Sequence, residues 1–417
     1  MSVQTNILTN IQPDIQTGLY VHIPFCASKC DYCDFLSFVG DNRNWANYQT
    51  TLLYEIQNCH IVAPSDNFGT FVKINKINNL DRINKIDTIY IGGGTPTVWP
   101  TLYLLQILQA LNASFLIEPG AEITCEANPG TLTSEELFSL QEAGINRLSL
   151  GLQAWQSHLL TALGRETTRD AFVENFCQAR MAGFKNISVD VMFALPGQTL
   201  EDWKETLHEV VALNPEHISA YALTLEENTP LWKRFAFDDG NNEEELEKID
   251  REMYAYCKTF LQACGYHQYE ISNFCKPGFE SRHNTGYWKR KPYLSFGLGA
   301  HSFFNGQRWN NTSDMETYLE MPATGNMKKI RQNIEEITVY DAMAETMFLG
   351  LRLTKGVSIE EFATQFGVTL MEVYGVWITQ MFAEGLLHEK NGHIQLTDLG
   401  MDLANRAMAG FLEPAQI

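Results

Sequence analysis

The sequence of 417 residues predicts an α/β protein: a partial (β/α)6, TIM-like barrel followed by a C-terminal α+β domain that resembles a winged helix. Two observations predict this fold. Between Leu19 and Cys264, short apolar runs alternate with longer stretches of helical spacing, which is typical of parallel strands joined by helices. After Gly265 the alternation stops. Six units are too few to close an eight-stranded barrel, so we expect a partial one.

The predicted barrel strands are Leu19–Ile23, Ile86–Ile91, Glu122–Ala127, Asn146–Gly151, Ile187–Ala194 and His217–Leu223. The predicted helices are Trp45–His60, Pro100–Ala113, Ser134–Ala143, Thr168–Ala182, Thr199–Leu213 and Glu243–Cys264. Right-handed crossovers place the carboxyl ends of all these strands at one edge of the sheet. We therefore expect the functional site at that edge.

The second half of the chain has a different pattern. Strands are predicted at Tyr269–Phe274 and Leu294–Phe304, on either side of a loop rich in Arg, Lys and aromatic residues. Three helices and a hairpin follow, at Glu335–Leu351, Ile359–Phe366, Leu370–Glu384 and Leu386–Leu396. Asn391-Gly392 is the predicted turn of the hairpin. This order of elements predicts the winged-helix-like domain.

These patterns divide the chain into four regions. They are an N-terminal tail (1–17), the barrel (18–265), an extension (266–333) and the winged-helix-like domain (334–417). Within the barrel, residues 64–85 contain the repetitive segment KINKINNLDRINK, which predicts a surface insertion without chemistry.

Composition limits the classes of partner. The formal net charge is −20 and the pI is about 4.9, which argues against nucleic acid as a partner. The winged-helix-like domain is therefore expected to have a structural or partner-docking role. The first basic residue is Lys29, so the N-terminus lacks the charged start of a signal peptide. Since no apolar run reaches roughly 18 residues, we expect a cytoplasmic protein without a transmembrane segment.

Three cysteines follow the first strand in a C-x3-C-x2-C motif: Cys26, Cys30 and Cys33. In a reducing compartment, such close spacing predicts metal binding rather than disulfides. Three thiolates can hold a [4Fe–4S] cluster and leave one iron open to a small molecule. A zinc site with His22 or Asp34 as the fourth ligand is the alternative.

Later strand ends carry further candidate residues. The segment Gly92–Pro96 (GGGTP) lets a ligand approach bare backbone, and because no GK[ST] follows, a nucleotide triphosphate is not expected. Glu126, Gln153, Arg165 and Asp190 come at or after successive strand ends. Carboxylates suit ribose hydroxyls or an ammonium group, and an arginine fork suits a carboxylate. Together these groups suit a zwitterionic adenosyl ligand.

The cysteine motif with Tyr32 before its last cysteine, the GGGTP loop and these four polar residues resemble the radical S-adenosylmethionine (SAM) superfamily. The resemblance is closest to its oxygen-independent coproporphyrinogen III oxidase-like branch and spans roughly Leu19 to the C-terminal domain. It implies that Cys26, Cys30 and Cys33 bind a [4Fe–4S] cluster whose open iron takes SAM, the source of a 5′-deoxyadenosyl radical. It also implies SAM contacts from Tyr20, Tyr32, Gly93, Gly94, Thr95, Glu126, Gln153, Arg165 and Asp190.

Two features bear on the type within this branch. The oxidases have a fourth cysteine two residues after the third, and Phe35 stands at that position here. They also have a longer N-terminal extension, whereas 19 residues precede Tyr20 here. Both departures argue against coproporphyrinogen III oxidase activity and leave open whether the protein is an enzyme.

A third feature points to haem. Arg282–Trp288 contains H-N-x-x-Y-W, which resembles the motif associated with haem binding in the haem-chaperone group of the branch. A loop histidine offers an axial ligand, and aromatic rings offer flat apolar faces. His283 is the predicted ligand, with support from Tyr287 and Trp288, and His301 is the alternative. The cations Arg282, Lys289, Arg290 and Lys291 are candidates for the propionates.

The resemblance therefore implies a radical SAM [4Fe–4S] protein that binds haem and transfers it to an acceptor protein. For the acceptor, the family suggests respiratory or iron-storage proteins, with transient association at a membrane. Two alternatives stay open: an oxygen-independent coproporphyrinogen III oxidase, and a non-catalytic zinc-binding module.

Overall fold

The computed structural model describes residues 16–39, 44–62, 71–73, 85–235 and 243–412. Its central feature is a run of six parallel strands that are hydrogen-bonded neighbours in chain order. They are β1 (Thr17–Ile23), β6 (Ile86–Gly93), β7 (Ile117–Ala127), β8 (Arg147–Gln153), β9 (Ile187–Phe193) and β10 (His217–Ala222). The predicted partial (β/α)6 barrel is thus confirmed.

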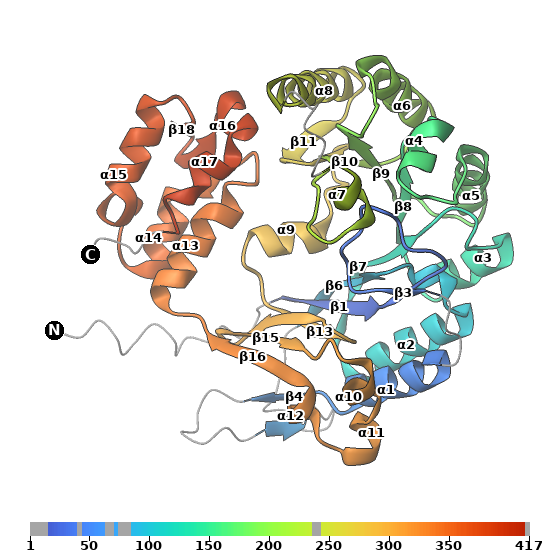
Figure 1. Ribbon diagram of the computed structural model, residues 1–417. Coiled ribbons are helices and arrows are strands. Elements are labelled where there is room, and N and C mark those ends of the chain that lie inside the picture. The colour runs from blue at the N-terminus through green and yellow to red at the C-terminus, as the bar shows by residue number, and fades with distance from the viewer. Residues whose placement is uncertain (1–15, 40–43, 63–70, 74–84, 236–242, 413–417) are drawn as a thin grey trace.

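Helices cover the outer face of these strands as an arc in Figure 1. They are α1 (Trp45–Gln57), α2 (Thr101–Ser114), α3 (Ser134–Glu142), α5 (Arg169–Met181), α6 (Leu200–Ala212) and α8 (Glu243–Ala263). Two begin at capping boxes, in which Thr133 and Thr199 exchange hydrogen bonds with the third residue of their helix. Short helices η2 (Pro96–Val98), α4 (Ser157–Ala162) and α7 (Pro230–Phe235) lie in the loops after strands.

Alternation along the strands sorts side chains into two environments. Leu19, Val21 and Ile23 of β1 are fully buried in the apolar core shared with the helices. The alternate residues Gly18, Tyr20 and His22 point to the other face, where Gly18 lies against Thr88 of β6 and the Tyr20 hydroxyl lies 3.0 Å from His22 Nδ1. Because successive side chains point to opposite faces of a strand, this pattern gives an apolar outer face and a polar barrel interior.

The extension continues the sheet on both sides. Strands β11 (His267–Glu270) and β12 (Asn273–Cys275) pair antiparallel, and β12 pairs with β10. On the other side β13 (Tyr293–Phe296) pairs parallel with β1, followed by β14 (His301–Phe304), β15 (Gln307–Asn311) and β16 (Arg331–Glu336). Three short helices, α10 (Met315–Leu319), α11 (Met321–Thr324) and α12 (Met327–Ile330), lie between β15 and β16.

Three predictions for this region are wrong. Tyr269–Phe274 is a tight hairpin rather than one strand, because Glu270 accepts a hydrogen bond from the Ser272 backbone and turns the chain. Leu294–Phe304 is two strands, because Gly297 and Gly299 have positive φ angles of 104° and 68°. The predicted loop is helix α9 (Arg282–Trp288), which the Ser281 side chain caps.

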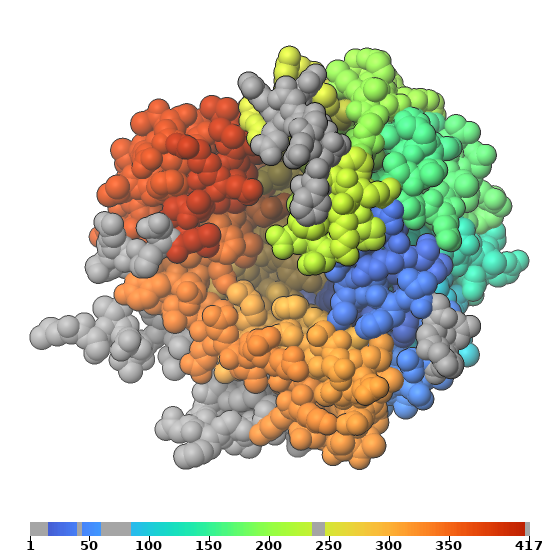
Figure 2. All heavy atoms as spheres, viewed as in Figure 1, coloured from blue at the N-terminus to red at the C-terminus, as the bar shows by residue number. Residues whose placement is uncertain are grey.

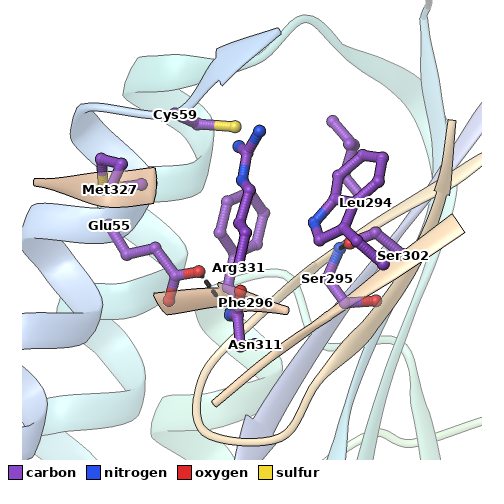
Figure 3. A pocket seen from close by; sticks show the side chains of 10 residues that line it. Glu55, Cys59, Leu294, Ser295, Phe296, Ser302, Asn311, Met327 and Arg331 are labelled. Atoms are coloured by element: carbon purple, nitrogen blue, oxygen red, sulfur yellow. Dashed lines mark hydrogen bonds between the residues drawn. The ribbon is translucent and has the colours of Figure 1, made fainter. Parts of the chain in front are cut away.

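A buried carboxylate fastens the extension to α1, as Figure 3 shows. Glu55 accepts hydrogen bonds from Gly297 N (2.9 Å), Asn311 Nδ2 (2.7 Å) and Tyr318 Oη (2.7 Å). It lines a small pocket with Cys59, Leu294, Ser295, Phe296, Ser302, Trp309, Asn311, Met327 and Arg331. Burial raises the pKa of Glu55 to about 7.

We expect Glu55→Ala to lower the free energy of unfolding by about 3 kcal/mol, because three buried donors lose their acceptor. Urea unfolding measures this change. Glu320→Ala is the control, since Glu320 makes an exposed ion pair with Lys329. That control should cost about 0.5 kcal/mol or less. Equal losses in both variants would contradict the role of Glu55.

The C-terminal domain has its own apolar core. Helices α13 (Val339–Gly350), α14 (Ile359–Phe366) and α15 (Leu370–Ala383) pack with the sheet β17 (Val357–Ser358), β19 (His393–Leu396) and β18 (Leu387–Lys390). The hairpin turns at Asn391 and Gly392, both with positive φ, as predicted. Helix α13 begins later than predicted because Thr338 caps it and the preceding residues form β16. Two short helices, α16 (Asp398–Asp402) and α17 (Ala404–Ala409), were not predicted.

The predicted insertion at 64–85 lies mostly outside the described residues. Of it, β5 (Phe71–Lys73) pairs antiparallel with β4 (His60–Val62).

Candidate functional site

Polar side chains from neighbouring strands meet inside the barrel. Tyr90 Oη donates to Glu126 Oε1 at 2.7 Å, and Tyr221 Oη donates to Gln153 Oε1 at 3.0 Å. Asp190 accepts from the hydroxyls of Ser149 (3.0 Å) and Ser188 (3.2 Å). The polar interior of the barrel therefore also includes residues that were not predicted: Tyr90, Ser149, Ser188 and Tyr221. Their signal in the sequence is period-two spacing, as in Arg147, Ser149, Gly151 and Gln153 of β8.

The cysteine loop covers the carboxyl end of β1. It begins with β2 (Phe25–Cys26), which pairs with β3 (Phe38–Val39). Cys26, Cys30 and Cys33 are unbonded thiols of intermediate exposure. Burial raises the pKa of the Cys26 and Cys33 thiols. Three partly accessible soft donors on one short loop fit one face of an iron–sulfur cluster.

The GGGTP loop lies directly against the cysteine loop. Gly94 N donates to Ile23 O at 2.9 Å and Thr95 N donates to Phe25 O at 2.7 Å. Thr95 Oγ1 lies 3.7 Å from Cys26 Sγ. A Cβ atom on Gly94 would lie 2.6 Å from Phe25 O and 3.0 Å from Cys26 Sγ, so a side chain would push the two loops apart.

Arg165 links the cysteine loop to the strand ends. Its guanidinium donates to Tyr32 Oη (3.2 Å), Asn128 Oδ1 (3.0 Å) and Gly151 O (2.9 Å), and Nη1 lies 3.7 Å from Cys30 Sγ. This cation thus faces both a thiol and Tyr32, a predicted SAM contact. The prediction missed Asn128, although it follows Glu126 by two residues at the end of β7.

Glu126 contacts the GGGTP loop, where its carboxylate accepts a hydrogen bond from Gly93 N at 3.1 Å. Burial is the main reason that the pKa of Glu126 is raised to about 7. Burial also raises the pKa of Asp190. Burial therefore disfavours the charged form of both carboxyls, although hydrogen-bond donors already contact each of them.

The remaining predicted SAM contacts lie in the same interior. Tyr20 Oη and His22 Nδ1 are 3.0 Å apart, and His22 Nε2 bonds to Leu36 O of the cysteine loop. Gln153 ends β8 with a positive φ of 72°, a strained conformation for this residue type. The structure thus gathers the predicted SAM residues around one barrel mouth, but their binding role stays a prediction.

His283 lies at the other end of the barrel. Its Nδ1 bonds to Thr88 Oγ1 (2.9 Å) and its Nε2 to Tyr287 Oη (2.8 Å). Gly93 is at the cysteine end of β6, and Thr88 lies five residues before it on the same strand. This spacing corresponds to roughly 16 Å. The His283 side chain is buried, and burial lowers its pKa to about 3. The imidazole is therefore neutral, and a metal could bind it only after Thr88 or Tyr287 moved away.

The neighbouring cations have partners of their own. Arg282 and Lys291 pair with Asp87, and Arg290 pairs with Glu345 of α13. The Arg352 guanidinium lies 4.3 Å over the Trp288 ring. His301, the alternative ligand, is exposed at the start of β14.

A column of aromatic rings joins the two ends of the barrel interior. The ring centroids are 6.0 Å apart for His22–Tyr20, 6.2 Å for Tyr20–Tyr90 and 5.3 Å for Tyr90–His283. Tyr90 is the link that the prediction missed. It lies two residues after Thr88 on the inward face of β6.

The parallel barrel and the thiol loop at its mouth define a class, the radical SAM proteins. The model of the Radical SAM superfamily matches residues 20–210, and the model of the HemN C-terminal domain matches residues 337–403. The chain is 35% identical to "Heme chaperone HemW" of Bacillus subtilis over 94% of this chain and 98% of the relative. It is 34% identical to the protein of the same name from Lactococcus lactis, over 94% and 96% of the two chains. The chain belongs to the HemW family of radical SAM proteins.

A solved structure shows the same fold. Coproporphyrinogen III oxidase (HemN) from Escherichia coli, described as a radical SAM enzyme, superposes with a TM-score of 0.76. The identity is 21%, over 96% of this chain and 90% of that chain. Membership of the radical SAM superfamily implies a [4Fe–4S] cluster and SAM as cofactors. Among the described residues, no helix has the length and apolar character that a membrane span requires.

Proposed function

We propose that this protein is a haem chaperone of the radical SAM type. The observation that carries the proposal is the match over nearly the whole chain to two proteins named as heme chaperones. Phe35 supports it, because an exposed phenyl ring stands where the oxidases of the branch have a fourth cysteine. We expect no conversion of coproporphyrinogen III to protoporphyrinogen IX. The zinc-module alternative is not favoured in a radical SAM protein.

The residues at the barrel mouth fit the implied cofactors. Cys26, Cys30 and Cys33 would hold the cluster. SAM would be bound by Tyr20, Tyr32, Gly93, Gly94, Thr95, Glu126, Gln153, Arg165 and Asp190. When bound, such a cluster supplies low-potential electrons and an open iron for SAM. Arg165 would orient the ligand by its fixed charge, and the two loops would limit the access of water.

Affinity for SAM should rise with pH if the Glu126 carboxylate binds the ligand. Burial raises the pKa of Glu126 to about 7, so the neutral carboxyl is the form that fits the unliganded protein and adds to its free energy of unfolding. This contribution to stability is complete below pH 4.5, the ordinary pKa of a glutamate, and is lost as the pH rises through about 7. With a pKa of about 7, the ionised fraction of Glu126 is about tenfold larger near pH 8 than near pH 6. A ligand that needs the carboxylate should bind more tightly by the same factor. Equilibrium dialysis at both pH values measures this, and Glu126→Gln should abolish the rise.

Haem would bind at the hollow above α9 that Figure 2 shows between the C-terminal domain and the region of α7. Tyr287 and Trp288 of this helix are partly exposed aromatic residues. If His283 is the ligand, haem competes with the Tyr287 hydroxyl for Nε2. The acceptor protein, its contact with a membrane and the cytoplasmic location remain parts of this proposal.

This competition makes a specific prediction. Tyr287→Phe removes the hydroxyl that occupies Nε2 and should tighten haem binding about fivefold, the value of one hydrogen bond. His283→Ala should abolish the shift of the Soret band that marks haem binding. Haem titration of the reconstituted protein, followed by its Soret band, measures both effects. If Tyr287→Phe is neutral while His301→Ala abolishes binding, His301 is the ligand and His283 has only a structural role.

A further inference from the structure

We propose that the β11–β12 hairpin and the turn after it form a second metal site, for one divalent ion of the zinc class, bound by His267, Cys275 and Glu280. The three donor atoms lie within 4.8 Å of one another. These residues belong to the β11–β12 edge of the large sheet. The cysteine loop follows β1, which is several strands away in the sheet order. The site does not depend on the proposed haem function.

The distances suit a tetrahedral ion. His267 Nε2 lies 3.6 Å from Cys275 Sγ. Zinc bonds of about 2.3 Å to sulfur and about 2.05 Å to nitrogen at a tetrahedral angle give a separation of about 3.6 Å. His267 Nε2 lies 2.8 Å from Glu280 Oε1, which is a hydrogen-bond distance. An ion would need to widen it by only about 0.5 Å.

The arrangement does not suit a proton relay. In a relay, the nucleophile and the carboxylate bond to opposite nitrogens of the histidine ring. Here the Cys275 thiol and the Glu280 carboxylate both face Nε2. One ring nitrogen cannot donate a proton to the carboxylate and accept one from the thiol at the same time. A metal ion satisfies all three groups together.

The backbone holds the donors in place without an ion. His267 and Cys275 are directly opposite in the β11–β12 register. A turn closed by Phe279 N to Lys276 O at 3.1 Å brings Glu280 back beside them. Cys275 is buried, whereas the side chains of His267 and Glu280 are 42% and 39% exposed. The fourth position of the ion would thus face solvent, as in zinc sites with three protein ligands and a water.

Binding would also affect α9. Glu280 immediately precedes Ser281, which caps this helix. An ion at Glu280 would therefore fasten the start of the helix that carries His283 to the edge of the sheet. Burial raises the pKa of the Cys275 thiol to about 12, so the ion must displace this proton.

Cobalt(II) titration tests the site. The full chain with Cys26, Cys30 and Cys33 changed to Ser removes the competing thiols. We expect one equivalent of cobalt with thiolate charge-transfer absorption and tetrahedral visible bands. Adding Cys275→Ser should remove the charge-transfer absorption and weaken binding at least about tenfold. Cys177→Ser, at an exposed thiol on α5, is the matched control and should change nothing. Absorption that survives Cys275→Ser would overturn the proposal.

A second measurement covers the case in which the triple variant does not fold. The unaltered chain, reconstituted with iron and sulfide and then exposed to zinc, should retain about one zinc per chain after gel filtration. His267→Ala should lose this zinc and keep its iron. If the unaltered chain holds no zinc, or if His267→Ala holds as much as the unaltered chain, the proposed site does not exist.

Discussion

Cys30→Ala is expected to abolish the iron–sulfur cluster. With two thiolates left, the loop cannot hold one face of a cube, so iron and sulfide should fall from about four each per chain to near zero. SAM binding should be lost with them, because the open iron would be the anchor of the methionine group. Anaerobic reconstitution followed by iron and sulfide analysis measures the first loss, and equilibrium dialysis with SAM measures the second.

The control for this experiment is Cys177→Ser, which alters an exposed thiol on α5. It should keep the full iron content and SAM affinity. Circular dichroism of both variants shows whether the barrel is folded. If Cys30→Ala retains iron at the level of the unaltered chain, the cysteine loop is not the cluster site.

The second large effect is expected from Arg165→Ala. This guanidinium bridges Tyr32, Asn128 and Gly151, and its Nη1 lies 3.7 Å from Cys30 Sγ. A charge-assisted pair with a carboxylate contributes about 2 to 3 kcal/mol, so SAM should bind roughly 30- to 160-fold more weakly. The cluster itself should still form, because its three thiolates are unchanged. Dialysis with SAM on reconstituted protein measures the affinity.

Arg169→Ala is the matched control, since Arg169 is an exposed arginine nearby that pairs with Asp170. Its SAM affinity should equal that of the unaltered chain. Arg165→Lys should restore little, because a point charge cannot replace the fork that reaches several oxygens. Unchanged SAM affinity in Arg165→Ala would show that this residue only fastens the loops.

The sequence predicted most of the barrel because its elements depend on local patterns. Apolar runs such as Ile187–Ala194 and capped helices such as the one after Thr199 carry their signals within a few residues. The strand-end residues followed from the same pattern, because parallel strands bring their carboxyl ends together. Arg165 lies outside a strand, yet the structure places it beside Cys30 and Tyr32.

The region around α9 was predicted less well because its conformation depends on distant partners. The His283 backbone donates to Glu122, and the side chain bonds to Thr88, about two hundred residues earlier in the chain. No local pattern shows such contacts, so the segment resembled an exposed loop. The hairpin at Glu270 was missed for a similar reason, since the side chain that turns the backbone also pairs with Arg352 of the C-terminal domain.

The most direct test of the central claim is the electron paramagnetic resonance spectrum of the reduced, anaerobically reconstituted protein, recorded with and without SAM. The claim is that three thiols at the barrel mouth hold a cluster with one open iron, to which SAM binds. We expect the signal of a reduced [4Fe–4S] cluster whose g values shift when SAM is added. A reduced cluster whose spectrum is identical with and without SAM, or a chain that takes up no iron, would contradict the claim.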